Sequence, residues 1–167
     1  LTGYTRARHE LDIVSEEAGR CLEVKADIGD TIGEKGIFAV LDTTFIDINI
    51  KKNLLSRKKL ENQTAYWIRD VKRYEHLIAR NAAAQSKLDE YRHKLDQVRL
   101  ELETLKAEET NLKERRKRFI IKAPAGWKLT ERYVEPGEWV AAGRDLGKAG
   151  DFRSLLIPFS LAPEEYK

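Results

Sequence analysis

Residues 88–119, LDEYRHKLDQVRLELETLKAEETNLKERRKRF, repeat apolar side chains at alternating spacings of three and four. The ten positions of this seam are Leu88, Tyr91, Leu95, Val98, Leu102, Leu105, Glu109, Leu112, Arg116 and Phe119, and all but Glu109 and Arg116 are apolar. A heptad pattern sustained over more than four heptads predicts a coiled-coil helix. A noisier seam precedes it, at Ile50, Arg57, Leu60, Thr64, Trp67, Val71, Tyr74 and Ile78.

The phase of the two seams breaks across residues 80–86, RNAAAQS, where Asn81 can form a turn. One continuous helix of about 70 residues is an alternative, but it would leave both apolar stripes in water. We therefore expect an antiparallel hairpin. With the turn centred near Ala83, Arg57 falls opposite Glu109, and these are charged exceptions in the two seams. A polar pair of this kind typically fixes register, which is our hypothesis for it.

The segments on either side of the helical region, residues 1–50 and 120–167, differ from it in composition. All ten glycines and all four prolines lie in them. They repeat each other at an offset of 108, where residues 28–32 match 136–140 and Phe38-Ala39 match Leu146-Gly147. Glycine supplies the positive φ of such turns, and the acidic residue after it can bond the turn backbone. Neither half buries a core alone. We expect the halves to pack together, bringing residues 42 and 123 side by side where the hairpin begins and ends.

The amino-acid composition excludes several classes of function. The 167 residues carry a net charge of +3, which is too balanced to imply a nucleic-acid partner. Cys21 is the sole cysteine, and the sequence offers no cysteine pair, Ser-His-Asp order or glycine-rich phosphate loop, so we expect no enzyme, no cofactor and no metal site. Methionine is absent, and no apolar run approaches the ~20 residues of a membrane span. We expect a processed product or a fragment, with any membrane anchor outside this sequence.

The two β-rich halves are similar to lipoyl or biotinyl half-motifs. The similarity lies in Gly19, 29–32 and 37–42 of the first half, and in 121–124, Gly126, 134–140 and Gly143 of the second. Split by a helical hairpin, these halves resemble the membrane fusion proteins, or periplasmic adaptors, of the hemolysin-D and tripartite-efflux family. The resemblance implies an α+β fold, a split lipoyl-like β-sandwich (barrel-sandwich hybrid) with an inserted antiparallel coiled-coil α-hairpin.

The same resemblance divides the chain into a first half-motif (1–44), the hairpin (45–119, turn near 80–86), a second half-motif (120–150) and the start of a β-barrel domain (151–167). It implies a non-catalytic periplasmic adaptor, anchored to the inner membrane by a segment outside this chain. Its partners would be an ATP- or proton-driven inner-membrane transporter, an outer-membrane channel of TolC type, and further copies of itself in a ring. A coiled-coil scaffold or oligomerisation protein is the alternative. A lipoyl or biotinyl carrier component is a further one, although helix replaces the lysine-bearing hairpin of such carriers.

Two sets of residues are candidate surfaces for contact with partner proteins. In the family, the hairpin tip carries an arginine, a leucine four residues on and a serine seven further; Arg73, Leu77 and Ala84 occupy these positions, so the serine is missing. Arg80 and Ser86 complete the predicted tip surface. The alternative is a solvated arginine beside an ordinary leucine.

The second set is a basic collar at the base of the hairpin, where the two helix ends meet. It comprises Lys51, Lys52, Lys58, Lys59, Arg115, Lys117 and Arg118. Cations at the end of the second helix suit its dipole, whereas those at the start of the first oppose it. That excess favours an acidic partner surface, a transporter domain or anionic lipid. A solvated face is the alternative.

Overall fold

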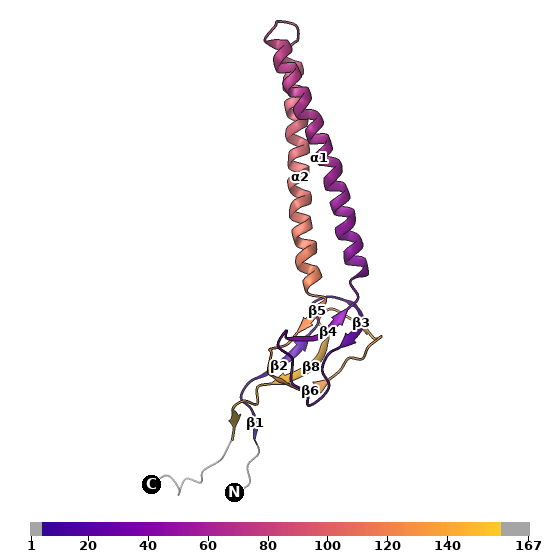
Figure 1. Cartoon of the computed structure of the whole chain (residues 1–167), viewed down its shortest axis with the longest axis vertical. Coiled ribbons are helices and arrows are strands. Elements are labelled where there is room, and N and C mark those ends of the chain that lie inside the picture. The colour runs from indigo at the N-terminus through magenta and orange to yellow at the C-terminus, as the bar shows by residue number, and fades with distance from the viewer. Residues whose placement is uncertain (1–4, 158–167) are drawn as a thin grey trace, which may run out of the picture. The chain divides into compact units, whose positions relative to one another are not determined.

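The computed structural model describes residues 5–157. Its residues fall into two compact units: a β-rich unit made of the described residues up to Thr43 and from Lys117 onward, and a helical unit, Thr44–Arg116. Figure 1 shows two long helices and a set of short antiparallel strands. The predicted α+β class is confirmed.

The β-rich unit contains two antiparallel sheets and a short ribbon (Figure 1). Its strands are β1 (Arg6–Ala7), β2 (Glu10–Val14), β3 (Gly19–Val24), β4 (Ile37–Leu41), β5 (Ile120–Lys122), β6 (Lys128–Arg132), β7 (Trp139–Val140), β8 (Asp145–Gly150) and β9 (Leu155–Leu156). One sheet has the order β2-β8-β6 and the other β5-β4-β3-β7, while β1 pairs with β9. The core consists of side chains from both halves of the chain, among them Ile13, Phe38, Leu41, Leu129 and Leu146.

The repeat at offset 108 is confirmed in the turns. Gly29 has φ 91° and Gly137 has φ 89°, the left-handed conformation that glycine adopts without strain. In the first turn the backbone N–H of Asp27 donates to the Asp30 carboxylate at 2.9 Å. The backbone N–H of Glu135 donates to the Glu138 carboxylate at 3.1 Å in the second. The acidic residue after each glycine therefore closes its own turn.

The two halves also exchange hydrogen bonds symmetrically. The Gly29 N–H donates to the Leu129 carbonyl at 2.8 Å, and the Gly137 N–H donates to the Cys21 carbonyl at 2.7 Å. Because 29 and 137 are equivalent in the repeat, and 21 and 129 likewise, each half binds the turn of the other in the same way. Neither half satisfies these backbone groups alone, so the halves fold as one unit.

Strands β4 and β5 frame the insertion, but with a different register from the one expected. The Leu41 N–H donates to the Phe119 carbonyl at 2.8 Å, and the Ala123 N–H donates to the Gly36 carbonyl at 2.9 Å. Residue 41 therefore lies beside 119, and the expected pairing of 42 with 123 is wrong. The register shifts between Ile37 and Ala39, an irregularity that glycine and apolar spacing do not reveal.

The helical unit is a hairpin of α1 (Thr44–Ile78) and α2 (Gln85–Lys117). Ion pairs join Asp47 to Arg116 at 2.5 Å and Glu75 to Arg92 at 2.8 Å, so the helices run antiparallel. Asn81 lies in the connection with φ 55°, as the break in the seam predicts. Near the connection, Val71, Leu88 and Leu95 form a buried core, with Trp67, Ile68, Tyr74, Ile78 and Tyr91 packed against it.

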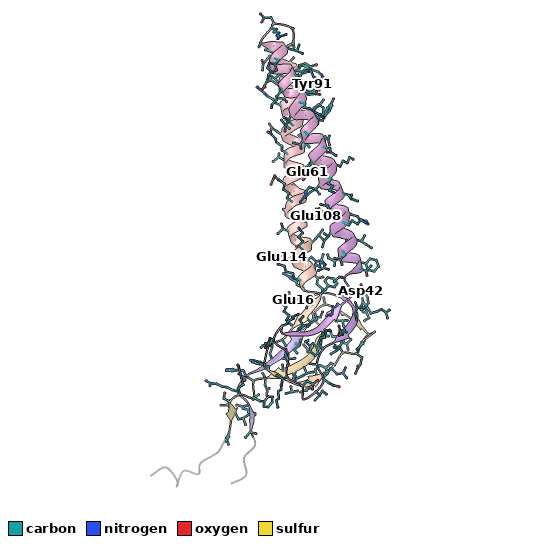
Figure 2. All side chains as sticks on the ribbon, in the orientation of Figure 1. Glu16, Asp42, Glu61, Tyr91, Glu108 and Glu114 are labelled. Atoms are coloured by element: carbon teal, nitrogen blue, oxygen red, sulfur yellow. The ribbon has the colours of Figure 1, made fainter. Side chains whose placement is uncertain are left out.

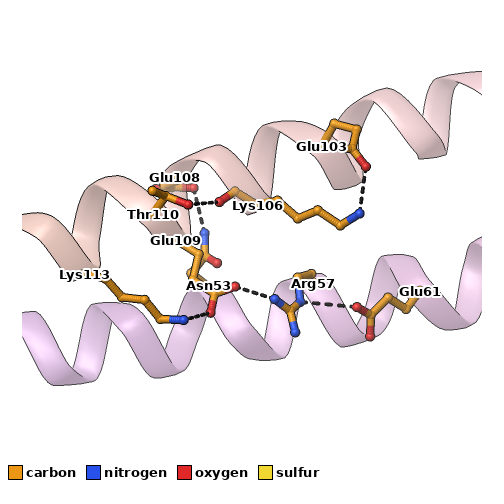
Figure 3. A network of polar contacts seen from close by, with 9 residues as sticks. All are labelled: Asn53, Arg57, Glu61, Glu103, Lys106, Glu108, Glu109, Thr110 and Lys113. Atoms are coloured by element: carbon orange, nitrogen blue, oxygen red, sulfur yellow. Dashed lines mark hydrogen bonds and ion pairs between the residues drawn. The ribbon is translucent and has the colours of Figure 1, made fainter.

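The seam is less completely buried toward the other end of the hairpin. Leu102, Leu105 and Leu112 are half-buried there, and the predicted contact between Arg57 and Glu109 is confirmed. Figure 3 shows this pair within a polar network, in which Arg57 also lies 3.2 Å from Glu61 and Lys113 lies 2.6 Å from Glu109. Both side chains of the Arg57–Glu109 pair are mostly shielded from water, with 27% and 12% exposed.

Candidate partner-binding surfaces

The predicted tip residues surround the connection between α1 and α2. Arg73, Arg80, Ala84 and Ser86 are exposed, whereas Leu77 is half-buried. The Leu77 carbonyl accepts the N–H groups of Arg80 at 3.2 Å and Ala82 at 2.9 Å, which ends the helix. The structure thus offers two exposed cations near the tip, with a half-buried leucine between them in sequence.

Asp70 anchors the first of these cations and was missed from sequence. Its side chain is only 8% exposed and lies 3.1 Å from the Arg73 guanidinium, which is 67% exposed. The acid and the arginine are three residues apart, a spacing that places them on one helix face and could have revealed the pair. Arg73 is therefore partly neutralised within its own helix.

A cluster of aromatic rings and lysines lies around Tyr91 in the half of the hairpin nearer the tip (Figure 2). The Tyr91 ring centroid lies 5.6 Å from that of Trp67 and 4.6 Å from that of Tyr74. The Lys94 ammonium sits 5.3 Å from the Trp67 centroid, within the range of a cation–π contact.

Glu90 joins two lysines of this cluster. It accepts hydrogen bonds from Lys87 at 2.6 Å and Lys94 at 2.5 Å, and these bonds lower the pKa of its carboxyl to about 2. The same bond raises the pKa of Lys87. Glu90 and Lys87 therefore both stay charged across the physiological range.

The basic collar divides into paired and unpaired cations. Arg118 lies 3.3 Å from Glu16 in the β-rich unit, and Arg115 and Lys117 each make contacts of their own. Lys51, Lys52, Lys58 and Lys59 are exposed, and none has an ion pair within residues 5–157. The uncompensated charge of the collar therefore comes from the start of α1.

In the β-rich unit we looked for a reactive cysteine, exposed aromatic residues and metal ligands. Burial raises the pKa of the Cys21 thiol, and the side chain is fully buried, so it is unsuited to act as a nucleophile. Trp139 and Tyr133 are 64% and 41% exposed. Between residues 5 and 157 no cluster of three metal-ligating side chains occurs. Neither helix in that range is apolar over the length needed to cross a bilayer.

No protein-family model matches the sequence, and no curated protein matches it. Solved structures do match. MacA from Actinobacillus actinomycetemcomitans superposes with a TM-score of 0.76 at 13% identity, over 93% of this chain and 53% of its own. The membrane fusion protein Spr0693 from Streptococcus pneumoniae gives 0.70 at 13%, over 94% and 65%.

The periplasmic adaptor protein EmrA superposes with a TM-score of 0.58 at 13% identity, over 93% of this chain and 76% of its own. The chain thus spans about half of MacA and two thirds of Spr0693. The matches cover both the strands and the hairpin, because they include over nine tenths of the chain. The chain therefore has the fold of the membrane fusion, or periplasmic adaptor, proteins.

Proposed function

We propose that this chain is a non-catalytic periplasmic adaptor, which links an inner-membrane transporter to an outer-membrane channel of TolC type for efflux or secretion. The observation that carries the proposal is the long helical hairpin inserted between two β-rich halves, a fold shared with a periplasmic adaptor and a membrane fusion protein. Such a hairpin presents partner contacts at its tip, far along the chain from the β-rich halves.

The tip is the proposed contact with the channel. Arg73 and Arg80 are exposed there, together with Ala84 and Ser86, and Leu77 adds a half-buried apolar side chain. Helices dock in grooves through residues of this spacing, with an apolar anchor flanked by polar groups. Individual contacts of this size are weak, and a ring of several copies would multiply them through effective concentration.

A leucine substitution at the tip tests channel docking. We expect Leu77→Asp to abolish export of the cargo and co-purification with the channel, while the helical content stays unchanged. Leu100→Asp is the matched control, because Leu100 is 70% exposed on α2 outside the tip. Equal export by wild type and Leu77→Asp would contradict docking through the tip. Loss of export in Leu100→Asp as well would point to general damage to the hairpin.

The four unpaired lysines of the collar are the proposed contact with an acidic surface of the transporter. Charges of one sign on an exposed helix face steer and strengthen such encounters at low salt. We expect the quadruple replacement of Lys51, Lys52, Lys58 and Lys59 by glutamate to reduce co-purification with the transporter at low salt. Unchanged recovery at low salt would show that the collar is a solvated face.

A further inference from the structure

The first helix of the hairpin exposes large apolar side chains on the face that points away from α2. They are Phe45, Ile48, Leu55 and Tyr66, which are 80%, 43%, 57% and 49% exposed. On a helix of about 3.6 residues per turn, Leu55 lies roughly opposite Asn53, whose amide nitrogen bonds to α2. α2 therefore does not cover this apolar face of α1.

The apolar residues of this face follow the spacing of a coiled-coil seam. Alternating steps of three and four residues connect the positions that we call the outer seam: Phe45, Ile48, Lys52, Leu55, Lys59, Asn62 and Tyr66. Side chains at this spacing insert into the holes between side chains of a facing helix. The two lysines can lay their aliphatic stems along apolar neighbours and keep their ammonium groups at the edge. The seam that contains Val71 packs against α2, whereas the outer seam has no helix against it within residues 5–157.

Positive charge accompanies the outer seam. Its two lysines and the lysine before each of them are exposed, and none of the four has an ion pair within residues 5–157: Lys51, Lys52, Lys58 and Lys59. The two acids between residues 45 and 66 are engaged elsewhere, because Asp47 pairs with Arg116 and Glu61 with Arg57. The lysines are therefore uncompensated, and charge complementarity calls for an acidic partner.

A second copy of this chain does not supply the matching surface. Two outer seams placed together would bring the same unpaired lysines face to face, which disfavours association. α2 exposes a single large apolar side chain along its length, that of Leu100. An apolar stripe with carboxylates beside it must therefore come from another protein.

We propose that the outer seam docks an amphipathic helix of a partner protein, one that carries acidic residues on both sides of an apolar stripe. Ile48 and Leu55 bury against that stripe, and carboxylates beside it pair with Lys51 and Lys58. The lysine contact with the transporter thereby becomes a contact with a helix, held by apolar as well as charged groups. The transporter as partner rests on the proposed function, whereas the acidic helix rests on the seam and its charge alone.

Two synthetic helical peptides of opposite charge test the partner's chemistry. Both carry leucine at the a and d positions of three heptads, and the positions beside this stripe are glutamate in one peptide and lysine in the other. Fluorescence anisotropy measures their binding to the full 167-residue chain. The acidic peptide should bind at least about tenfold more tightly than the basic one, and its Kd should rise with salt. An acidic peptide that binds no more tightly than the basic one overturns the proposal.

A single substitution tests the apolar part of the outer seam. Leu55→Asp should raise the Kd of the acidic peptide at least about tenfold, because it removes a central anchor and adds a like charge. Leu100→Asp is the matched control, because Leu100 is exposed on α2, and its Kd should stay within about threefold of wild type. Equal effects of the two substitutions overturn the proposal.

Charge reversal separates recognition from misfolding. Replacing Lys51, Lys52, Lys58 and Lys59 by glutamate should invert the preference, so that the basic peptide binds more tightly than the acidic one. Adding Leu55→Asp to this variant should remove that binding again, because docking also needs the apolar anchor. A variant that keeps the wild-type preference, or binding that does not depend on Leu55, overturns the proposal.

Co-purification with the transporter is measured separately. If the peptides bind as expected but the four-lysine variant still recovers the transporter, the acidic-helix site stands and the transporter is not its partner. If that variant loses the transporter while Leu55→Asp keeps both the transporter and the acidic peptide, the lysine contact stands and helix docking is overturned. Helix docking is also overturned if Leu55→Asp abolishes self-association in sedimentation velocity, or if vesicles with about 30% anionic lipid displace the acidic peptide. The face would then belong to a second copy or to a membrane surface.

Discussion

At the scale of single residues, Asp151 is a carboxylate of the β-rich unit that an arginine two residues on holds in its charged form. It is buried and accepts bonds from Arg153 Nε at 2.8 Å and Nη2 at 2.7 Å, which lower its pKa to about 2. The charged form is thus favoured in the folded state. The pair stabilises the fold fully above the ordinary pKa of 3.8, and this contribution is lost as pH falls from about 4 toward 2.

Asp151→Asn should therefore lower the thermal midpoint at pH 6 more than at pH 3. The two proteins are compared at each pH, so that other titrating groups cancel. The measurement is thermal unfolding followed by circular dichroism. An equal gap between the two midpoints at both pH values would show that the ion pair contributes nothing through its charge.

The Arg57–Glu109 pair has a different role, because it joins two helices. Arg57→Leu leaves the Glu109 carboxylate, which is 12% exposed, with the Lys113 ion pair that Figure 3 also shows, and should lower the free energy of unfolding by about 1–3 kcal/mol. Adding Glu109→Leu should recover most of that loss, because two leucines complete the seam. Urea unfolding checks both values, and a double variant less stable than the single one would contradict the argument.

The register hypothesis makes a separate prediction for the same double variant. Without the polar pair, leucines can slide past one another by a heptad. The distances between spin labels at Tyr66 and Leu100, which are exposed on α1 and α2, should broaden relative to wild type. A distribution as narrow as that of the wild type would remove the registry role.

At the scale of elements, the approach of β8 to β6 depends on Gly147. A Cβ at this position would lie 2.5 Å from the Glu131 carbonyl oxygen, and backbone cannot yield as a flexible side chain would. Gly147→Ala should therefore cost about 1–3 kcal/mol of unfolding free energy. Gly33→Ala is the control, because nothing lies within 4 Å of a Cβ there, and it should stay within about 0.5 kcal/mol. Equal urea midpoints for the two variants would contradict the close approach.

The elements also show which features a sequence can reveal. The Gly29 and Gly137 turns were predictable because the positive φ and the acid that closes the turn are local to a few residues. The Arg57–Glu109 contact was predictable because a charged side chain in an apolar seam is costly unless it pairs with an opposite charge. The register of β4 against β5 depends on an irregularity between Ile37 and Ala39, and the partial exposure of Leu105 depends on how closely the two helices pack at its level. Neither feature can be predicted from the spacing of apolar residues and glycines in the sequence.

At the scale of the whole molecule, the helical unit is an insertion between two adjacent strands. β4 and β5 are antiparallel neighbours, and Leu41 is bonded to Phe119, so the chain ends left by removing the hairpin already lie side by side. Joining Asp42 to Arg118 through Asn-Gly would close them into an ordinary β-hairpin, since this dipeptide suits the tight turn between such strands.

That shortened chain should fold, because the buried side chains of the β-rich unit and the exchanged turns at Gly29 and Gly137 all lie outside the deleted residues. We expect its far-ultraviolet circular dichroism to lose most of the helical signal while thermal unfolding stays cooperative. The amides of Gly29 and Gly137 should remain as protected from hydrogen exchange as in the full chain, because their hydrogen bonds to the Leu129 and Cys21 carbonyls persist. If the shortened chain shows no cooperative transition, the two β-rich halves need the hairpin in order to fold together.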